Sequence, residues 1–278
     1  MAQITASEVN RLRKQTGAGM MDCKKALVET NGDFDQAIDV LRKKGQKVAA
    51  KRADRETTEG TVLAIVNKDS NCGVVLSLNC ETDFVAKNDN FISLTEKIIN
   101  LALESRVLDI ESLKSHAFDD TMTIGEKLLE QTGVIGEKLE ISNYHLLQNV
   151  SHVTAYVHPG NKLASLVGFN ISFEGVVDVG KNVAMQIAAM NPLSLSEDDL
   201  SQDIIEKELE IGKDLARQEG KPENMLEQIA KGRLKKFFKE NTLLNQVYIK
   251  DSKKTIAQYL KDSNLELSIV EYKRVNLG

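Results

Sequence analysis

Residues 73–87 read GVVLSLNCETDFVAK, so an apolar stretch runs directly into a polar turn that carries one aromatic residue. In the apolar part, Val74, Leu76, Leu78 and Cys80 are spaced two residues apart. Side chains alternate between the two faces of a strand, so this spacing predicts a strand with one face buried in the protein core. The turn that follows is therefore expected at the end of a rigid element.

The turn after this strand contains Thr82, Asp83 and Phe84. Threonine and aspartate favour helix caps and turns, because their side-chain oxygens accept hydrogen bonds from nearby backbone N–H groups. The ring of Phe84 can then either fold back into the core or project as a wedge toward a partner. The local pattern leaves both positions open, and the choice between them decides the function of the chain.

Composition narrows the class of protein. The chain has 278 residues, of which 28% are charged and 41% hydrophobic, enough for two or three modules with their own cores. Its net charge of -5 argues against a general nucleic-acid binder, and no apolar run approaches the ~18–20 residues of a membrane span. The N-terminus, MAQIT, lacks the basic and apolar regions of a secretory signal, and three cysteines are typical of a reducing compartment. We therefore expect a cytoplasmic protein with no membrane contact and no direct nucleic-acid partner.

Residues 1–45 are expected to form a bundle of three short helices. A capping box at Thr5 begins the first helix and Gly17 ends it. A second helix follows the glycine-rich connection, and Asp33 caps a third helix, which we expect to stop at Gly45. Bundles of this size are marginally stable, so they depend on efficient packing.

Two core regions are expected after a linker at 46–59 that begins as helix and becomes extended. The first spans 60–136, and the second combines 137–191 with 241–278. In the first, alternating and helical spacings predict strands at 61–67 and 73–80 and helices at 91–103 and 122–131. In the second, they predict a separate sheet with strands at 141–147, 152–158, 163–171 and 266–274, and helices at 176–190 and 254–261. Pro159-Gly160-Asn161 is expected to form a hairpin turn in that sheet.

Residues 192–240 are expected to form an antiparallel helical hairpin, with helices at 200–219 and 222–239 joined at Gly220-Lys221. Its apolar stripes contain Leu200, Ile204, Ile211 and Leu215 on one helix and Leu226, Ile229, Leu234 and Phe237 on the other. The pattern fits a hairpin folded onto the body and a projecting interaction arm equally well. Together these elements place the chain in the α+β class.

No constellation of residues predicts an active site. There is no G-x-x-x-x-G-K-[ST] loop for phosphates, and the histidines have neither the spacing nor the cysteine partners of a zinc site. His152 and His158 are expected on the exposed polar face of one strand, and Cys80 on a buried face, where a thiol is usually inert. We therefore predict no catalytic residue, no cofactor and no metal.

Without a predicted active site, the function is expected to depend on surfaces that bind other molecules. Met20 and Met21 are adjacent, and both cannot face the core of so small a bundle, so at least one is expected to be exposed. Methionine is flexible and recurs at binding surfaces, although one exposed methionine can also be incidental. The turn at Phe84, the turn at His158 and the helical hairpin are the other candidate surfaces.

Several of these motifs resemble the bacterial translation elongation factor Ts family. The resemblance is carried by TGAGMMDCKKAL at 16–27, NGD at 31–33 and NCETDFVAK at 79–87, and continues through YVHPG at 156–160, GKP at 220–222 and GRLKKF at 232–237. It covers nearly the whole chain in the family's order. It departs at the C-terminal end, where the further helical module of many members is not expected, because the chain ends soon after its last predicted strand.

The resemblance implies a ubiquitin-associated-like N-terminal domain, two α/β core subdomains and a coiled-coil dimerisation hairpin, and thus a possible homodimer through 192–240. It also implies guanine-nucleotide exchange on elongation factor Tu and no enzymatic chemistry. The turn of Thr82, Asp83, Phe84 and Val85 would dislodge the partner's magnesium ion, with Phe84 as the wedge. The N-terminal surface of Leu12, Arg13, Met20 and Met21 would dock on the partner's nucleotide-binding domain, and His158 and Gly160 would hold another of its domains.

Two other functions fit parts of the pattern. The N-terminal bundle could serve a binding adaptor for ubiquitin-like or nascent-chain partners, with the remainder as scaffold. Cys80 could serve a cysteine-dependent enzyme with a histidine as its base. Thiol alkylation would test the second of these functions directly.

Overall fold

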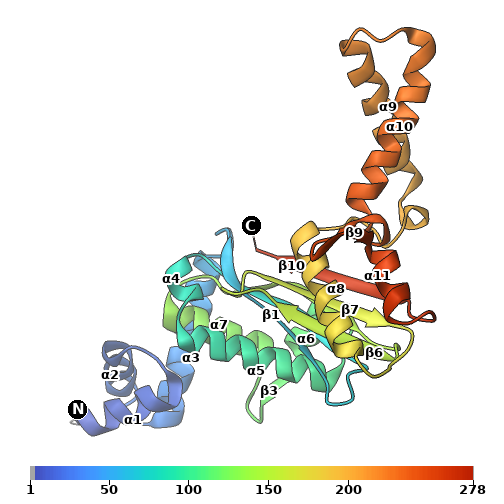
Figure 1. Ribbon diagram of the computed structural model, residues 1–278. Coiled ribbons are helices and arrows are strands. Elements are labelled where there is room, and N and C mark those ends of the chain that lie inside the picture. Colours follow the sequence, from blue (N-terminus) through green and yellow to red (C-terminus); the bar gives the residue numbers. More distant parts are fainter. Residues whose placement is uncertain (1–3, 278) are drawn as a thin grey trace. The chain divides into compact units, whose positions relative to one another are not determined.

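The computed structural model describes residues 4–277 (Figure 1). The chain forms two compact units. The first contains the residues up to Leu63, then Leu76–Leu146, and the residues from Val275 onward; the second contains Ala64–Val75 and Leu147–Arg274. The expectation that MAQIT is no secretory signal concerns a segment whose residues 1–3 lie outside the described part. None of the described helices combines the length and the hydropathy that a bilayer span requires.

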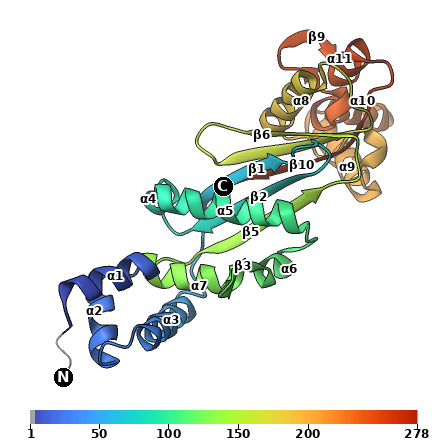
Figure 2. The same ribbon diagram turned by 90° about the horizontal axis from the view of Figure 1, so that it is seen from below.

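Three helices open the first unit, as predicted: α1 (Ala6–Thr16), α2 (Met20–Glu29) and α3 (Phe34–Lys51) (Figure 2). The capping box at Thr5 is present, because the Thr5 hydroxyl accepts from the Glu8 N–H while the Glu8 carboxylate accepts from the Thr5 N–H. Gly17 ends α1 with a φ of 71° in the left-handed region that glycine favours. Apolar residues at helical spacing form the bundle core, which contains Val9, Leu12, Cys23, Ala26, Leu27 and Ala37.

Gly45 does not end α3, so that prediction was wrong. The helix continues to Lys51, and Gly45 is buried against Gly133 of α7 (Ile124–Ile135). Glycine ends many helices, but it also lets two helices approach closely, and the second role applies here. The expected linker is therefore helical to Lys51 and irregular from there until the first strand.

The first sheet has the strand order β1-β2-β5, with β1 (Glu59–Val66), β2 (Gly73–Cys80) and β5 (Glu140–Leu147). Since β2 is the central strand, all eight of its residues are buried, and not only the one face that the alternation predicted. The strands predicted at 61–67 and 73–80 are confirmed. The strand predicted at 141–147 exists as β5, but its assignment to the second sheet was wrong, because alternation shows which face is buried and not which strand lies alongside.

The helices of the first unit follow this sheet in sequence. α4 (Asp83–Ala86) is a single turn, and α5 (Asp89–Ser105) and α7 confirm the helices predicted at 91–103 and 122–131. Between α5 and α7 lie three short elements that the sequence did not predict: α6 (Ile110–Ser115), β3 (Ala117–Asp119) and β4 (Met122–Thr123). The turn at α4 therefore lies between the central strand and a long helix with one buried face.

The second unit contains a sheet of order β10-β7-β6, with β6 (His152–Val157), β7 (Leu163–Phe169) and β10 (Ile269–Asn276). The C-terminal strand thus returns to this sheet as predicted. β6 and β7 pair antiparallel around the Pro159-Gly160 turn. α8 (Val176–Met190) and α11 (Ile256–Ser263) confirm the predicted helices and contribute Val183, Ile187, Ile256 and Leu260 to the core. The small hairpin of β8 (Val247–Tyr248) and β9 (Asp251–Thr255) and the short turns η1 (Glu197–Asp199) and η2 (Leu243–Asn245) were not predicted.

The helical hairpin is formed by α9 (Gln202–Gln218) and α10 (Glu223–Asn241), which pack along each other and extend away from the sheet of their own unit (Figure 1). Small residues make the close contact between them: a Cβ atom on Gly212 would lie 3.3 Å from the Cβ of Ala230. Of the predicted apolar stripes, Leu200 and Leu226 are buried, whereas Ile204, Ile211 and Leu215 remain exposed. The hairpin is therefore a projecting arm with apolar residues on its surface.

Candidate functional site

The Phe84 ring projects into solvent. β2 ends at Cys80, and α4 begins three residues later at Asp83. Thr82 is its N-cap, whose hydroxyl accepts from the Val85 N–H at 3.4 Å. Phe84 is 84% exposed on this single helical turn. Of the two positions that the sequence left open, the structure takes the exposed one, so the ring is available to a partner.

The neighbours of Phe84 hold the turn to the body of the first unit. The Ala86 side chain is buried, and its carbonyl accepts from the Thr61 hydroxyl of β1 at 3.3 Å. Asp83 forms an exposed ion pair with Lys87 at 2.7 Å, and this hydrogen bond raises the pKa of Lys87 above its ordinary value. The ring of Phe84 itself projects from this anchored turn into solvent.

An open cavity of about 550 Å³ lies beside Phe84. Its lining comes from α4 and α5, from the end of α7, and from Gly17 at the α1–α2 connection of the N-terminal bundle. The apolar lining residues are Phe84, Val85, Phe91, Leu94, Val134 and Ile135. The cavity shows that the Phe84 turn and the bundle contribute to one continuous surface of the first unit.

The bundle exposes both methionines. Met20 is 52% and Met21 62% exposed in the first turn of α2, whereas Cys23, Ala26 and Leu27 form its buried stripe. Arg13 is exposed as well. The prediction that at least one methionine is exposed is confirmed, and each of the three side chains is accessible to a partner.

Leu12 must be removed from that surface. It is 0% exposed and belongs to the core between the three helices of the bundle. The sequence placed it in the apolar stripe of α1, and that stripe faces inward. Its contribution is therefore to the stability of the bundle, and a direct contact between Leu12 and a partner is excluded in this conformation.

In the second unit, His158 and Gly160 lie at the exposed turn between β6 and β7. The Nδ1 atom of His158 lies 2.9 Å from the Tyr156 hydroxyl, and Gly160 has a φ of 91°, which this tight turn requires. His152 was expected to be exposed on the same strand, and that prediction was wrong. It is buried, its Nε2 lies 3.1 Å from the Thr154 hydroxyl, and burial lowers its pKa. α8 packs against β6 and covers this face, which local alternation could not show.

Nucleophilic chemistry at Cys80 is not supported. The thiol is buried, and burial together with the nearby charge of Glu137 raises its pKa to about 12. A reactive cysteine requires the opposite, a lowered pKa and access to solvent. Across residues 4–277, no three histidine, cysteine or acidic side chains are grouped so that they could hold a metal ion.

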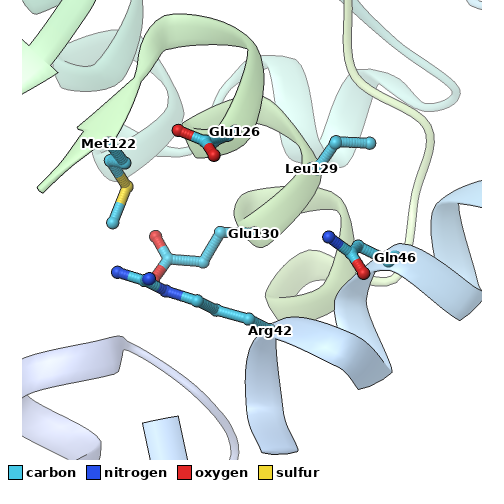
Figure 3. Close-up of a pocket in the computed structure, with 6 residues that line it drawn as sticks. All are labelled: Arg42, Gln46, Met122, Glu126, Leu129 and Glu130. Carbon is cyan, nitrogen blue, oxygen red and sulfur yellow. The ribbon is translucent and has the colours of Figure 1, made fainter. Parts of the chain in front are cut away.

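A second cavity, between α3 and α7, is too small for a ligand. Figure 3 shows Arg42 of α3 pointing toward Glu130 of α7, and the remaining lining residues are Gln46, Met122, Glu126 and Leu129. Its volume is about 50 Å³, enough for a few water molecules. It is a small gap in the packing of these helices.

Two acidic residues that the sequence analysis did not single out contact the Phe84 turn. Glu81 directly precedes it, and Glu137 follows α7, more than fifty residues along the chain. Both lie in charge-rich stretches in which nothing distinguishes them from solvated surface residues. Only the folded chain shows that they meet.

Comparisons with known proteins identify the family of the chain. The family model described as Elongation factor TS matches residues 81–278. Similar proteins named Elongation factor Ts occur in Christiangramia forsetii, 55% identical over 278 residues, and in Flavobacterium psychrophilum, 54% identical over 278 residues, each covering 100% of both chains. A third, from Porphyromonas gingivalis, is 47% identical over 275 residues, 99% of this chain and 98% of its own. Because the family model and these full-length relatives match its sequence, the chain belongs to the elongation factor Ts family.

Proposed function

We propose that the chain acts in translation elongation as a guanine-nucleotide exchange factor. In this role it binds elongation factor Tu·GDP in the cytoplasm, displaces the partner's Mg²⁺ and promotes GDP release so that GTP can bind. It catalyses no bond chemistry. Family membership supports the proposal, and the observation that carries it is the Phe84 ring, 84% exposed on a short, anchored turn.

An exposed aromatic ring suits the displacement of a bound magnesium ion. Mg²⁺ requires near-ideal octahedral geometry, so a small displacement of its ligands weakens binding strongly. Inserting the Phe84 ring between elements of the partner would bury it, which contributes roughly 1.5–3 kcal/mol. This contribution is available only in the partner conformation whose elements have moved apart. Phe84 therefore favours the conformation that holds nucleotide weakly.

Thermodynamic linkage also predicts that binding of the factor weakens nucleotide binding by the partner. A factor that binds the nucleotide-free partner more tightly than the loaded one must weaken nucleotide binding by the same ratio. Equal affinity for both forms would change nothing, however tight the complex. The factor must also dissociate when nucleotide returns, which favours several moderate contacts over one dominant interface.

The remaining surfaces would supply those moderate contacts. Arg13, Met20 and Met21 would dock on the partner's nucleotide-binding domain, since flexible methionine side chains adapt to an apolar surface. The turn at His158 and Gly160 would hold another domain of the partner. The exposed apolar stripe of the helical hairpin would join two copies of the chain.

The release of fluorescently labelled GDP from elongation factor Tu, measured by stopped flow, tests the proposal. Phe84→Ala should slow chain-stimulated release by about tenfold or more, as the lost ring burial predicts. Leu265→Ala is the matched control, because Leu265 is 87% exposed and is followed by Glu266, which bonds Asn170 after the end of β7 opposite to the His158 turn. Release at the wild-type rate with Phe84→Ala would show that the ring is not the wedge.

A further inference from the structure

The short helix that carries Phe84 cannot maintain its own geometry. α4 has four residues, and an isolated helix of fewer than about 12–15 residues is marginal in water. Its carboxyl end is tied to β1 by the bond between Thr61 and Ala86 at 3.3 Å. The direction of the ring therefore depends on what fixes the amino end, at Glu81 and Thr82.

The carboxylate of Glu137 fixes that end with both of its oxygens. Oε2 accepts from the backbone N–H of Glu81 at 3.1 Å and from that of Thr82 at 3.0 Å. Oε1 accepts from the Thr82 hydroxyl at 2.7 Å. Hydrogen bonds to an ionised carboxylate are stronger than those between neutral groups. The same Thr82 hydroxyl also accepts from the Val85 N–H, so Glu137 orients the group that caps the helix.

Glu81 makes the reciprocal hydrogen bond to the segment that contains Glu137. Its Oε1 accepts from the Lys138 N–H at 2.7 Å, so each of the two segments places a carboxylate on the other's backbone. Arg52 is the C-cap residue of α3, and its Nη1 lies 2.7 and 2.8 Å from the two oxygens of Glu81. These contacts join the start of the Phe84 turn to the end of α7 and to the end of α3.

We infer that Glu137 is a positioning residue for the Phe84 wedge, supported by the pair of Glu81 and Arg52. The inference rests on the proposed function of Phe84. Because Glu137 holds the two residues before α4, the ring points in one direction before the partner arrives. A turn that is already ordered does not lose that conformational freedom on binding, so more of the interaction energy acts on the partner.

The test compares Glu137→Gln with Glu104→Gln, a glutamate on the exposed surface of α5. Glutamine has nearly the same shape but only one acceptor oxygen, so it cannot accept all three bonds. Without any partner, hydrogen exchange at the Ala86 and Lys87 amides should become about fivefold faster or more in Glu137→Gln, the loss expected for about one hydrogen bond. Glu104→Gln should leave both amides at their wild-type rates. Unchanged exchange at these amides in Glu137→Gln would overturn the inference whatever the GDP assay shows.

The GDP assay then separates positioning from a direct contact. Glu137→Gln should lower the maximal rate of GDP release by about fivefold, with little change in the concentration of chain that gives half that rate. In the Phe84→Ala background the same substitution should change release by less than about twofold, because the two residues act through one ring. A full additive loss in that background would show that Glu137 acts independently of Phe84.

Two further results must be interpreted separately: a failure of the proposed function, and a Glu137→Gln variant that does not fold. If the amides loosen as expected but Phe84→Ala itself does not slow release, the proposed function fails while the structural role of Glu137 stands. If Glu137→Gln does not fold, Arg52→Gln replaces it, because the Arg52 side chain is 34% exposed and the Glu81 carboxylate, 16% exposed, still accepts from the Lys138 N–H. Arg52→Gln should also accelerate hydrogen exchange at the Ala86 and Lys87 amides, although by less than Glu137→Gln. Unchanged exchange in Arg52→Gln would contradict the inference.

Discussion

A Cβ atom on Gly133 of α7 would overlap the Cα atom of Gly45 in α3, so these helices cross with no side chain between their backbones. α3 is the third helix of the N-terminal bundle. Val134, which follows Gly133 in α7, packs against the core of that bundle. α7 also ends just before Glu137, which holds the Phe84 turn. One helix thus supports both surfaces that we propose to meet the partner's nucleotide-binding domain.

Gly133→Ala should destabilise the chain, because the added methyl group forces the two helices apart. Overpacking of this kind costs about 1–3 kcal/mol. Gly232→Ala is the control for the intrinsic gain of replacing a helical glycine, since a Cβ there meets no atom within 4 Å. Urea unfolding followed by circular dichroism measures both variants. Equal free energies of unfolding for the two variants would contradict a close crossing at Gly133.

Asp83→Ala should slow GDP release less than Phe84→Ala does. Thr82 and not Asp83 caps α4, and the Asp83 carboxylate pairs with Lys87 at an exposed position where water and salt screen the interaction. Stopped-flow measurements under identical conditions rank the two variants. A loss from Asp83→Ala as large as that from Phe84→Ala would instead indicate that this carboxylate acts directly on the partner.

Glu81 should make the stability of the chain depend on pH. The bond from the Lys138 N–H, and secondarily the Arg52 guanidinium, hold its pKa below the ordinary value of 4.5. The unfolded chain therefore takes up a proton at a pH at which the folded chain does not. The stability from Glu81 is present above pH 4.5 and is lost as the pH falls through its lower folded pKa.

Glu81→Gln should thus reduce the decline in unfolding free energy as the pH falls below 4.5, where the unfolded carboxylate takes up a proton before the folded one does. Urea unfolding at a series of pH values gives the slope. Glu104→Gln serves as the control and should keep the wild-type slope, because Glu104 is an exposed side chain on α5. A wild-type slope in Glu81→Gln would show that its bonds to Lys138 and Arg52 contribute no pH-dependent stability.

The cysteines should not react with a thiol reagent in the native chain. Cys23, Cys72 and Cys80 are buried, and a pKa of about 12 leaves Cys80 almost entirely protonated at neutral pH. Ellman's reagent should therefore give no rapid absorbance change until guanidinium unfolds the chain, after which all three thiols react. Rapid native reaction assigned to Cys80 by mass spectrometry would revive the cysteine-dependent enzyme as an alternative.

The helical hairpin should mediate self-association if the proposed homodimer forms. Ile211 and Leu215 lie one turn apart on α9 and are exposed, so burial against a second copy would remove their apolar surface from water. The double substitution Ile211→Glu with Leu215→Glu should convert dimers to monomers in light scattering. Gln218→Glu adds a charge at an exposed position of the same helix and should leave the mass unchanged. A wild-type monomer, or a double variant of unchanged mass, would exclude a dimer through this face.

Many elements of this fold were predictable from the sequence because they depend on neighbours in the chain. The capping box at Thr5 and the turn at Gly160 rest on interactions within a few residues, and the strand that ends at Cys80 is marked by a local alternation of apolar residues. The exposure of the adjacent methionines followed from the same kind of local argument. The candidate site could be located in this way, since a polar turn with an aromatic residue is visible in the sequence itself.

Only the tertiary structure decided which role each ambiguous residue takes. Gly45 could end a helix or allow a close crossing, and Gly133, far along the chain, determines that it does the second. His152 is buried because α8 covers its strand, and Phe84 is exposed because Thr61 and Glu137 hold the turn on both sides of it. Burial and hydrogen bonding at these positions depend on groups that are distant in sequence. A local sequence pattern contains no information about which distant group the fold brings into contact with a residue.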